Sequence, residues 1–222
     1  MTTDNSMVQM SVHSLPDPAQ AAASPKRTRM GRLKMIAVLL VCAAPVIASY
    51  FTYYVVRPQT RTNYGELVEP QALPAELGLR DEAGRAVASA SLKQQWLLIA
   101  VAPGGCDAVC EKHLYWQRQI RETLGRDKDR VDRVWLIDDG QPMRPALAAA
   151  MAGATVLQAD RGVLAAWLKP AAGHALEEHF YLVDPQGHWM MRFPAQADAR
   201  KVQKDLMRLL RAANSWDEAG RP

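Results

Sequence analysis

The strongest constraint on the fold of this chain is an uncharged apolar run, Met35 to Val56, which follows a basic segment and ends at Arg57. As a helix, its roughly 22 residues would extend about 33 Å, enough to cross the hydrocarbon core of a bilayer. Pro45 is compatible with such a helix, because neighbouring groups in a membrane helix satisfy the carbonyl that a proline leaves free. The run therefore predicts a transmembrane helix over residues 35–56.

A cleaved signal peptide shows the same order of a basic region and then an apolar region. Here the apolar run is too long for a signal-peptide core, and it ends in the aromatic stretch YFTYY instead of a small-residue cleavage site. In addition, about thirty residues precede it. These features favour an uncleaved anchor.

The positive charge lies on the N-terminal side of this run, in Lys26, Arg27, Arg29, Arg32 and Lys34. The positive-inside rule then places the N-terminus in the cytoplasm and the chain after Arg57 across the membrane. In a bacterial inner membrane this compartment is the oxidising periplasm. The formal net charge of +4 is concentrated beside the membrane segment, so it does not indicate a nucleic-acid partner.

Composition and the positions of the prolines divide the rest of the chain into segments. Residues 1–34 are predicted to be a disordered cytoplasmic tail, residues 57–74 a linker with short extended pieces, and residues 214–222 a C-terminal tail. Pro58, Pro70 and Pro74 discourage helix in the linker. With 222 residues in all, residues 75–213 offer one folded domain with one good core.

The pattern of that domain alternates between strands and helices. Residues 77–92 predict two short strands around a turn, residues 95–103 a buried strand, and residues 107–125 a helix with Val109, Leu114 and Trp116 on its apolar face. Further strands are predicted at 132–139 and 154–160, helices at 144–152, 162–168 and 197–213, and a hairpin at 179–194. The predicted fold class is α/β with a thioredoxin-like arrangement, tethered by one N-terminal transmembrane helix.

The stretch APGGCDAVCEKHLYW contains Cys106 and Cys110, at the expected start of the helix after the first buried strand. A helix N-terminus lowers the pKa of a nearby thiol, which favours Cys106 as the more reactive sulfur. Cβ atoms four residues apart in a regular helix are about 5 to 6 Å apart, whereas a disulfide requires about 3.5 to 4.5 Å. The spacing therefore indicates either a labile disulfide with an irregular first turn or a pair of metal-binding thiolates.

The available ligands limit the metal. Structural zinc takes four Cys or His ligands, whereas copper(I) is soft and selects thiolates. Two thiolates with one imidazole would suit copper(I). His113 shares the helical face of Cys110 but also fits a solvated helix surface, and His188 fits an exposed turn. His174 and His179 precede the hairpin's first strand, which passes near the cysteine loop in a thioredoxin-like fold.

Three segments resemble the Sco (SenC) family of membrane-anchored thioredoxin-like proteins that load copper into cytochrome c oxidase. LRDEAGRAVASASLKQQWLLIAV is similar to the family's opening hairpin and first central strand. CDAVCEKHL is similar to its Cys-Pro-Asp-Val-Cys-Pro loop, and EEHFYLVDPQG to the segment with its distal histidine. The chain departs from the family in carrying Asp107 and Glu111 where the loop prolines would stand.

The resemblance implies a copper chaperone or assembly factor for a haem-copper oxidase, with Cys106, Cys110 and His179 as metal ligands and His174 as the substitute for His179. A second hypothesis is a periplasmic thiol-disulfide oxidoreductase, with Cys106 and Cys110 as the catalytic pair, that keeps the copper-site cysteines of the oxidase reduced. A third hypothesis is a non-catalytic membrane assembly protein with the same thioredoxin-like fold. The expected partners are the inner membrane and an oxidase subunit or another copper-assembly factor.

Overall fold

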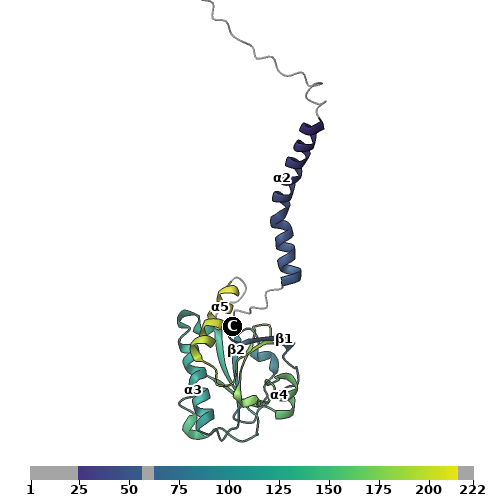
Figure 1. Ribbon diagram of the computed structural model, residues 1–222. Helices are drawn as coiled ribbons and strands as arrows, with labels where there is room; N and C mark the ends of the chain where they lie inside the picture. The colour runs from purple at the N-terminus through teal and green to yellow at the C-terminus, as the bar shows by residue number, and fades with distance from the viewer. Residues whose placement is uncertain (1–24, 57–62, 215–222) are drawn as a thin grey trace, which may run out of the picture. The chain divides into compact units, whose positions relative to one another are not determined.

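The computed structural model describes residues 25–56 and 63–214, in two compact units divided at Arg61 and Thr62 (Figure 1). The first unit contains helix α2, Pro25–Phe51, which continues as a π-helical turn, Thr52–Val56. The segment Arg29–Val55 is long and apolar enough to cross a membrane. One N-terminal helix is thus a candidate membrane span, as predicted.

The helix begins ten residues before the predicted start at Met35, so residues 25–34 are helical and are not part of a disordered tail. Proline is favoured at the first helical position, where its missing N–H has no intrahelical partner, and this accounts for the start at Pro25. The predicted tail residues 1–24, the linker residues 57–62 and the tail residues 215–222 lie outside the described residues.

The second unit is built on a six-stranded mixed sheet in the order β1-β6-β5-β2-β3-β4. The strands are β1 Glu66–Ala72, β2 Trp96–Ala102, β3 Val131–Ile137, β4 Thr155–Gln158, β5 Phe180–Val183 and β6 His188–Arg192. β2, β3 and β4 are parallel, whereas β5 runs antiparallel to β2 and is followed by β6 and β1 in antiparallel pairs. This arrangement confirms the predicted α/β thioredoxin-like class.

Helices cover both faces of the sheet (Figure 1). Leu98, Ala100 and Trp135 pack on one face with residues of α3, Ala108–Glu122, and α5, Ala199–Ala212. The alternate strand residues pack on the other face with α4, Arg161–Trp167. Every residue of β2 is buried, as expected for a central strand covered on both sides.

Residues 66–72, predicted to be part of a linker with short extended pieces, form the strand β1 at the edge of the sheet and so belong to the folded domain. Its register with β6 shifts between Leu67 and Gln71, the interval that contains Pro70. Proline cannot donate a ladder hydrogen bond, and an edge strand with an irregularity tolerates it. The segment is also held at its start, since buried Asp205 of α5 accepts hydrogen bonds from the Tyr64 and Gly65 N–H groups at 2.7 and 2.8 Å.

Two other elements differ from the prediction. Residues 144–152 form only a 3-10 turn, Pro145–Leu147, followed by irregular turns. The first predicted hairpin is reduced to a single bridge between Arg80 and Ala86, and its second strand is a 3-10 helix, Ser89–Leu92. Two further 3-10 helices, Gly125–Arg130 and Leu176–Glu178, connect α3 to β3 and precede β5.

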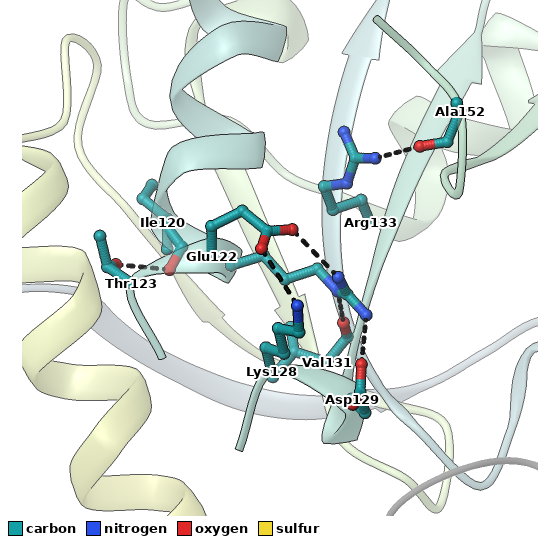
Figure 2. A network of polar contacts seen from close by, with 9 residues as sticks. Ile120, Glu122, Thr123, Lys128, Asp129, Val131, Arg133 and Ala152 are labelled. Atoms are coloured by element: carbon teal, nitrogen blue, oxygen red, sulfur yellow. Dashed lines mark hydrogen bonds and ion pairs between the residues drawn. The ribbon is translucent and has the colours of Figure 1, made fainter. Parts of the chain in front are cut away.

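A polar network joins the end of α3 to the beginning of β3 (Figure 2). Arg121 donates to the Val131 carbonyl at 2.8 Å and pairs with Asp129 at 3.0 Å, while Lys128 pairs with Glu122 at 3.3 Å. The buried Arg133 donates to the Ala152 carbonyl at 2.8 Å. The network fixes the C-terminal end of α3, the helix that carries Cys110 at its other end.

Candidate functional site

The cysteine loop lies between the carboxyl end of β2 and the start of α3. β2 ends at Ala102 and α3 begins at Ala108, so Cys106 lies outside the helix and Cys110 within its first turn. The two cysteines form a disulfide with a Cα–Cα distance of 5.2 Å. The predicted irregular turn is present, because Cys106 has a φ of +33° instead of a helical value.

Asp107 is the N-cap of α3. Its carboxylate accepts hydrogen bonds from the backbone N–H groups of Val109 at 3.1 Å and Cys110 at 2.9 Å. Such a cap satisfies donors that have no partner within the helix. It also places a negative charge beside Cys106, which opposes the effect of the helix N-terminus on that thiol.

The disulfide forms part of the wall of an open cavity of about 1260 Å³. Its lining is mainly apolar and includes Leu114, Trp116, Phe180, Ala195 and Ala197 beside the two cysteines. Cys106 is 1% exposed and Cys110 9% exposed, so both cysteines are buried in the wall of this cavity. Val109 and Trp116, predicted to face the core, are instead 75% and 39% exposed beside this cavity.

His113 lines the same cavity as the two cysteines and is half-buried, so it does not lie on a fully solvated helix surface. Its ring packs edge-on against Phe180, with ring centroids 3.8 Å apart. Burial lowers the pKa of His113 to about 4, although a hydrogen bond with the Glu177 backbone acts in the opposite direction. The imidazole is therefore neutral at pH 7.

His179 is buried, and both of its ring nitrogens contact the backbone. Nε2 accepts a hydrogen bond from the Ala171 N–H at 3.2 Å, so Nδ1 carries the proton and donates it to the Phe193 carbonyl at 2.8 Å. Burial lowers the pKa of His179. To bind a metal through Nε2, His179 would first have to release Ala171.

His174 lies at the surface, where Nδ1 pairs with the Glu178 carboxylate at 2.6 Å. Its ring centroid is 5.4 Å from that of His179, so the two histidines are neighbours. His188, expected to be exposed in the hairpin turn, is the partly buried first residue of β6 and pairs with Asp184 at 3.3 Å. Within residues 25–56 and 63–214, no group of three His, Cys, Asp or Glu side chains is arranged to hold a metal ion.

Asp138 and Asp139, which directly follow β3, were not predicted as part of the site. Asp138 is buried, and burial raises its pKa, although the Arg161 guanidinium pairs with its carboxylate. Arg161 also pairs with Glu177, which lines the cavity. The available signal was the pair of carboxylates directly after a buried strand, because the carboxyl ends of parallel strands meet at one edge of a sheet.

Comparisons with known proteins agree with this architecture. Residues 96–213 match a family model described as "Transmembrane-like, thioredoxin-like, C-terminal domain", which covers more than half of the chain. A search of curated proteins found no match.

Several solved structures are similar in fold. The apo Sco1 protein of Thermus thermophilus is 16% identical, with a TM-score of 0.50 over 69% of this chain and 98% of that one. Copper-bound ScoI of Bradyrhizobium japonicum is 20% identical, with a TM-score of 0.44 over 64% and 99% of the two chains. A thiol:disulfide interchange protein from Bacteroides sp. is 15% identical, with a TM-score of 0.49 over 65% and 91%.

The sheet order, the cysteine loop after β2 and the match over residues 96–213 lead to one assignment. The chain belongs to the family of transmembrane-like, thioredoxin-like proteins that this C-terminal domain defines.

Proposed function

We propose that the chain is a membrane-tethered thiol-disulfide oxidoreductase with Cys106 and Cys110 as its redox pair. The observation that carries the proposal is the placement of the disulfide in the wall of an open, mainly apolar cavity at the start of α3. Exchange requires that another sulfur reach the pair, and the cavity allows a partner to approach the wall in which the buried pair lies. In reduced form, the pair would transfer two electrons to a partner disulfide.

The exchange uses only these two sulfurs. The Cys106 thiolate attacks one sulfur of the partner disulfide, an intermolecular S–S bond forms, and the partner's other sulfur leaves and takes up a proton. The Cys110 thiolate then attacks the Cys106 sulfur, which releases the second partner thiolate and leaves the Cys106–Cys110 disulfide. The partner gains two electrons, and an external dithiol must reduce the pair before the next cycle.

We assign the attack to Cys106 because it directly precedes the capped N-terminus of α3. The resemblance to the Sco family suggests the substrate class, namely the copper-site cysteines of a cytochrome c oxidase subunit. The positive-inside rule suggests the compartment, with the domain on the periplasmic side of a bacterial inner membrane.

The test is to trap the intermediate in the full-length protein with Cys42 replaced by Ala. Cys110→Ser removes the resolving sulfur, so this variant should accumulate a mixed disulfide with a peptide that carries an oxidised copper-site cysteine pair. Cys106→Ser is the matched control and should trap little. Absence of a trapped product in both variants, while the reduced protein also leaves the peptide oxidised, would reject the proposal.

A second candidate function is copper(I) delivery to the oxidase, favoured by the two adjacent cysteine sulfurs in the wall of the cavity. Once reduced, the pair supplies the soft thiolates that copper(I) selects. The part of the chain that the structure describes does not arrange His179 or His174 as a third ligand, so the residues present fit a site of two thiolates.

Copper(I) titration of the reduced full-length protein separates this candidate from the first. One copper ion should bind per chain, Cys106→Ser and Cys110→Ser should abolish binding, and His179→Gln should leave the affinity within about threefold of the wild type. If either cysteine variant retains stoichiometric binding, the cysteine pair is not the copper site. Loss of binding in His179→Gln would instead restore His179 as a ligand.

A further inference from the structure

We propose that residues 138–144, after β3, form a clamp that holds the cysteine loop in the geometry of the disulfide, with Asp139 and Arg144 as positioning residues. The clamp contacts the chain on both sides of the cysteine pair. The proposal deepens the redox function proposed above and rests on it. It predicts that residues about 35 positions away in sequence set the redox equilibrium of Cys106 and Cys110.

The first contact is made to the residue two before Cys106. Asp139 Oδ1 accepts a hydrogen bond from the Gly104 N–H at 3.0 Å and another from the Gln141 N–H at 3.0 Å. The Arg144 N–H donates to the Gly104 carbonyl at 3.3 Å. Both backbone polar groups of Gly104 are therefore held by the clamp.

This contact requires a glycine at position 104. A Cβ atom there would lie 2.4 Å from the Gln141 carbonyl oxygen, closer than real Cβ contacts allow. The backbone of the cysteine loop at Gly104 thus lies directly against the backbone of the clamp at Gln141. Gly105, by contrast, has open space where its Cβ would be.

The second contact is made to the residue directly after Cys110. The Arg144 guanidinium pairs with the Glu111 carboxylate. Both side chains are about half exposed, 43% and 47%, so water screens the pair and we expect it to contribute less than Asp139. Glu111 and the cap Asp107 stand where the Sco resemblance would place prolines, and each makes a contact that orders the loop.

The contacts matter because Cys106 has an unfavourable backbone conformation. A φ of +33° is uncommon for a residue with a Cβ, and the Cys106 N–H closes a tight turn on the Pro103 carbonyl at 3.1 Å. In the dithiol form no covalent bond holds this turn. A clamp that keeps it in place raises the effective concentration of each thiol at the other, and so favours the disulfide over the dithiol.

The experiment is a redox titration of the full-length protein in detergent, with Cys42→Ala in every sample and glutathione buffers as the reference. Asp139→Ala should lower the equilibrium constant for disulfide formation about tenfold, which for a two-electron couple is a rise of about 30 mV in the potential. Arg144→Gln should lower it about threefold. Asp139→Asn retains an acceptor oxygen and should restore most of the wild-type value.

Asp81→Ala is the matched control. Asp81 Oδ1 also accepts two backbone hydrogen bonds, but from Ala83 and Arg85 in its own turn and not from the cysteine loop. Its removal should leave the potential unchanged. Thermal unfolding of each variant in both redox states verifies that the fold is retained.

A merely structural role for the clamp would lower the stability of the oxidised and reduced forms equally, and the potential would not move. If Asp139→Ala shifts the equilibrium constant less than twofold, the clamp proposal is wrong, even when the protein exchanges with partner disulfides. If the wild type fails to exchange with any partner disulfide but the shift is observed, only the proposed function fails.

Discussion

The imidazole of His113 is kept neutral in the cavity wall by burial, which lowers its pKa from 6.5 to about 4. In the unfolded chain, His113 takes up a proton near pH 6.5, whereas the folded state does so only near pH 4. The unfolded state therefore binds more protons between these values, and the free energy of unfolding falls as the pH decreases through this window. Above pH 6.5 His113 is neutral in both the folded and the unfolded state, so it no longer changes the free energy of unfolding with pH.

The first prediction follows from this shift. The free energy of unfolding should decrease by about 2 to 3 kcal/mol between pH 7 and pH 4 because of His113 alone. His179 acts in the same direction, so the measured quantity is the difference in pH slope between the wild type and His113→Gln. Urea unfolding followed by tryptophan fluorescence provides it, because all six tryptophans lie after residue 62.

The control for this measurement is His188→Gln, because His188 lies at the start of β6 and does not line the cavity. Comparison of the two variants separates the effect of the cavity from the removal of a histidine. A slope in His113→Gln equal to that of the wild type would show that the cavity does not exclude water from the ring.

His179 joins two backbone segments through its ring, and we expect its main contribution to be to stability. Replacing it by Ala leaves the Ala171 N–H and the Phe193 carbonyl without their buried partner. The second prediction is a loss of about 2 to 4 kcal/mol in the free energy of unfolding for His179→Ala. For the neighbouring His174→Ala, whose ring is half exposed, the loss should stay below about 0.5 kcal/mol. Equal losses in the two variants would contradict this assignment.

At the scale of elements, α3 and α5 offer a matched pair of N-caps. Asp107 accepts from the Val109 and Cys110 N–H groups, and Asp198 from those of Arg200 and Lys201. The third prediction is that Asp107→Ala and Asp198→Ala each cost about 1 kcal/mol of stability. Only Asp107→Ala should also accelerate alkylation of the reduced Cys106, because it removes a negative charge beside that thiol.

This prediction is tested by urea unfolding and by the rate of iodoacetamide labelling in the Cys42→Ala, Cys110→Ser background. An equal labelling rate with and without Asp107 would show that the cap carboxylate has no influence on the thiolate. A faster rate in Asp198→Ala would indicate a general loosening of the fold instead.

The strands with a continuous apolar run were the simplest to predict. β2, β3 and β5 are buried over all or nearly all of their residues, and their consecutive apolar side chains indicated this. Residues 57–74 were predicted to be a linker because Pro58, Pro70 and Pro74 discourage helix, and the strand β1 accepts Pro70 through its edge position and register shift. Residues 144–152 are rich in alanine, but helix propensity alone does not form a helix without a face to bury.

The site was predictable only where it is local in sequence. The cysteine pair follows from its spacing and its place after a buried strand. The burial of His113 depends on Phe180 and Glu177. The hydrogen bond that holds the Gly104 N–H comes from Asp139, 35 residues away. Contacts of this kind arise from the packing of β3 and β5 beside β2, which no local pattern encodes.

At the scale of the whole molecule, the described residues combine one candidate membrane helix with one thioredoxin-like domain. The fourth prediction concerns the anchor and its orientation. Mass analysis of the protein purified from membranes should show that residues 35–56 are retained, and a protease added to spheroplasts should digest the domain. A mass that lacks these residues, or a domain protected from the protease, would contradict the uncleaved, outward-facing anchor.

The central claim of the account is that Cys106 and Cys110 form an exchangeable redox pair and not a structural disulfide. The most direct measurement is the reduction potential of this pair in the full-length Cys42→Ala protein, read from alkylation and mass analysis across a series of dithiol buffers. We predict reversible two-electron behaviour with a midpoint above about −300 mV, the range below which structural disulfides typically lie. A pair that stays oxidised in buffers more reducing than this value would contradict the claim.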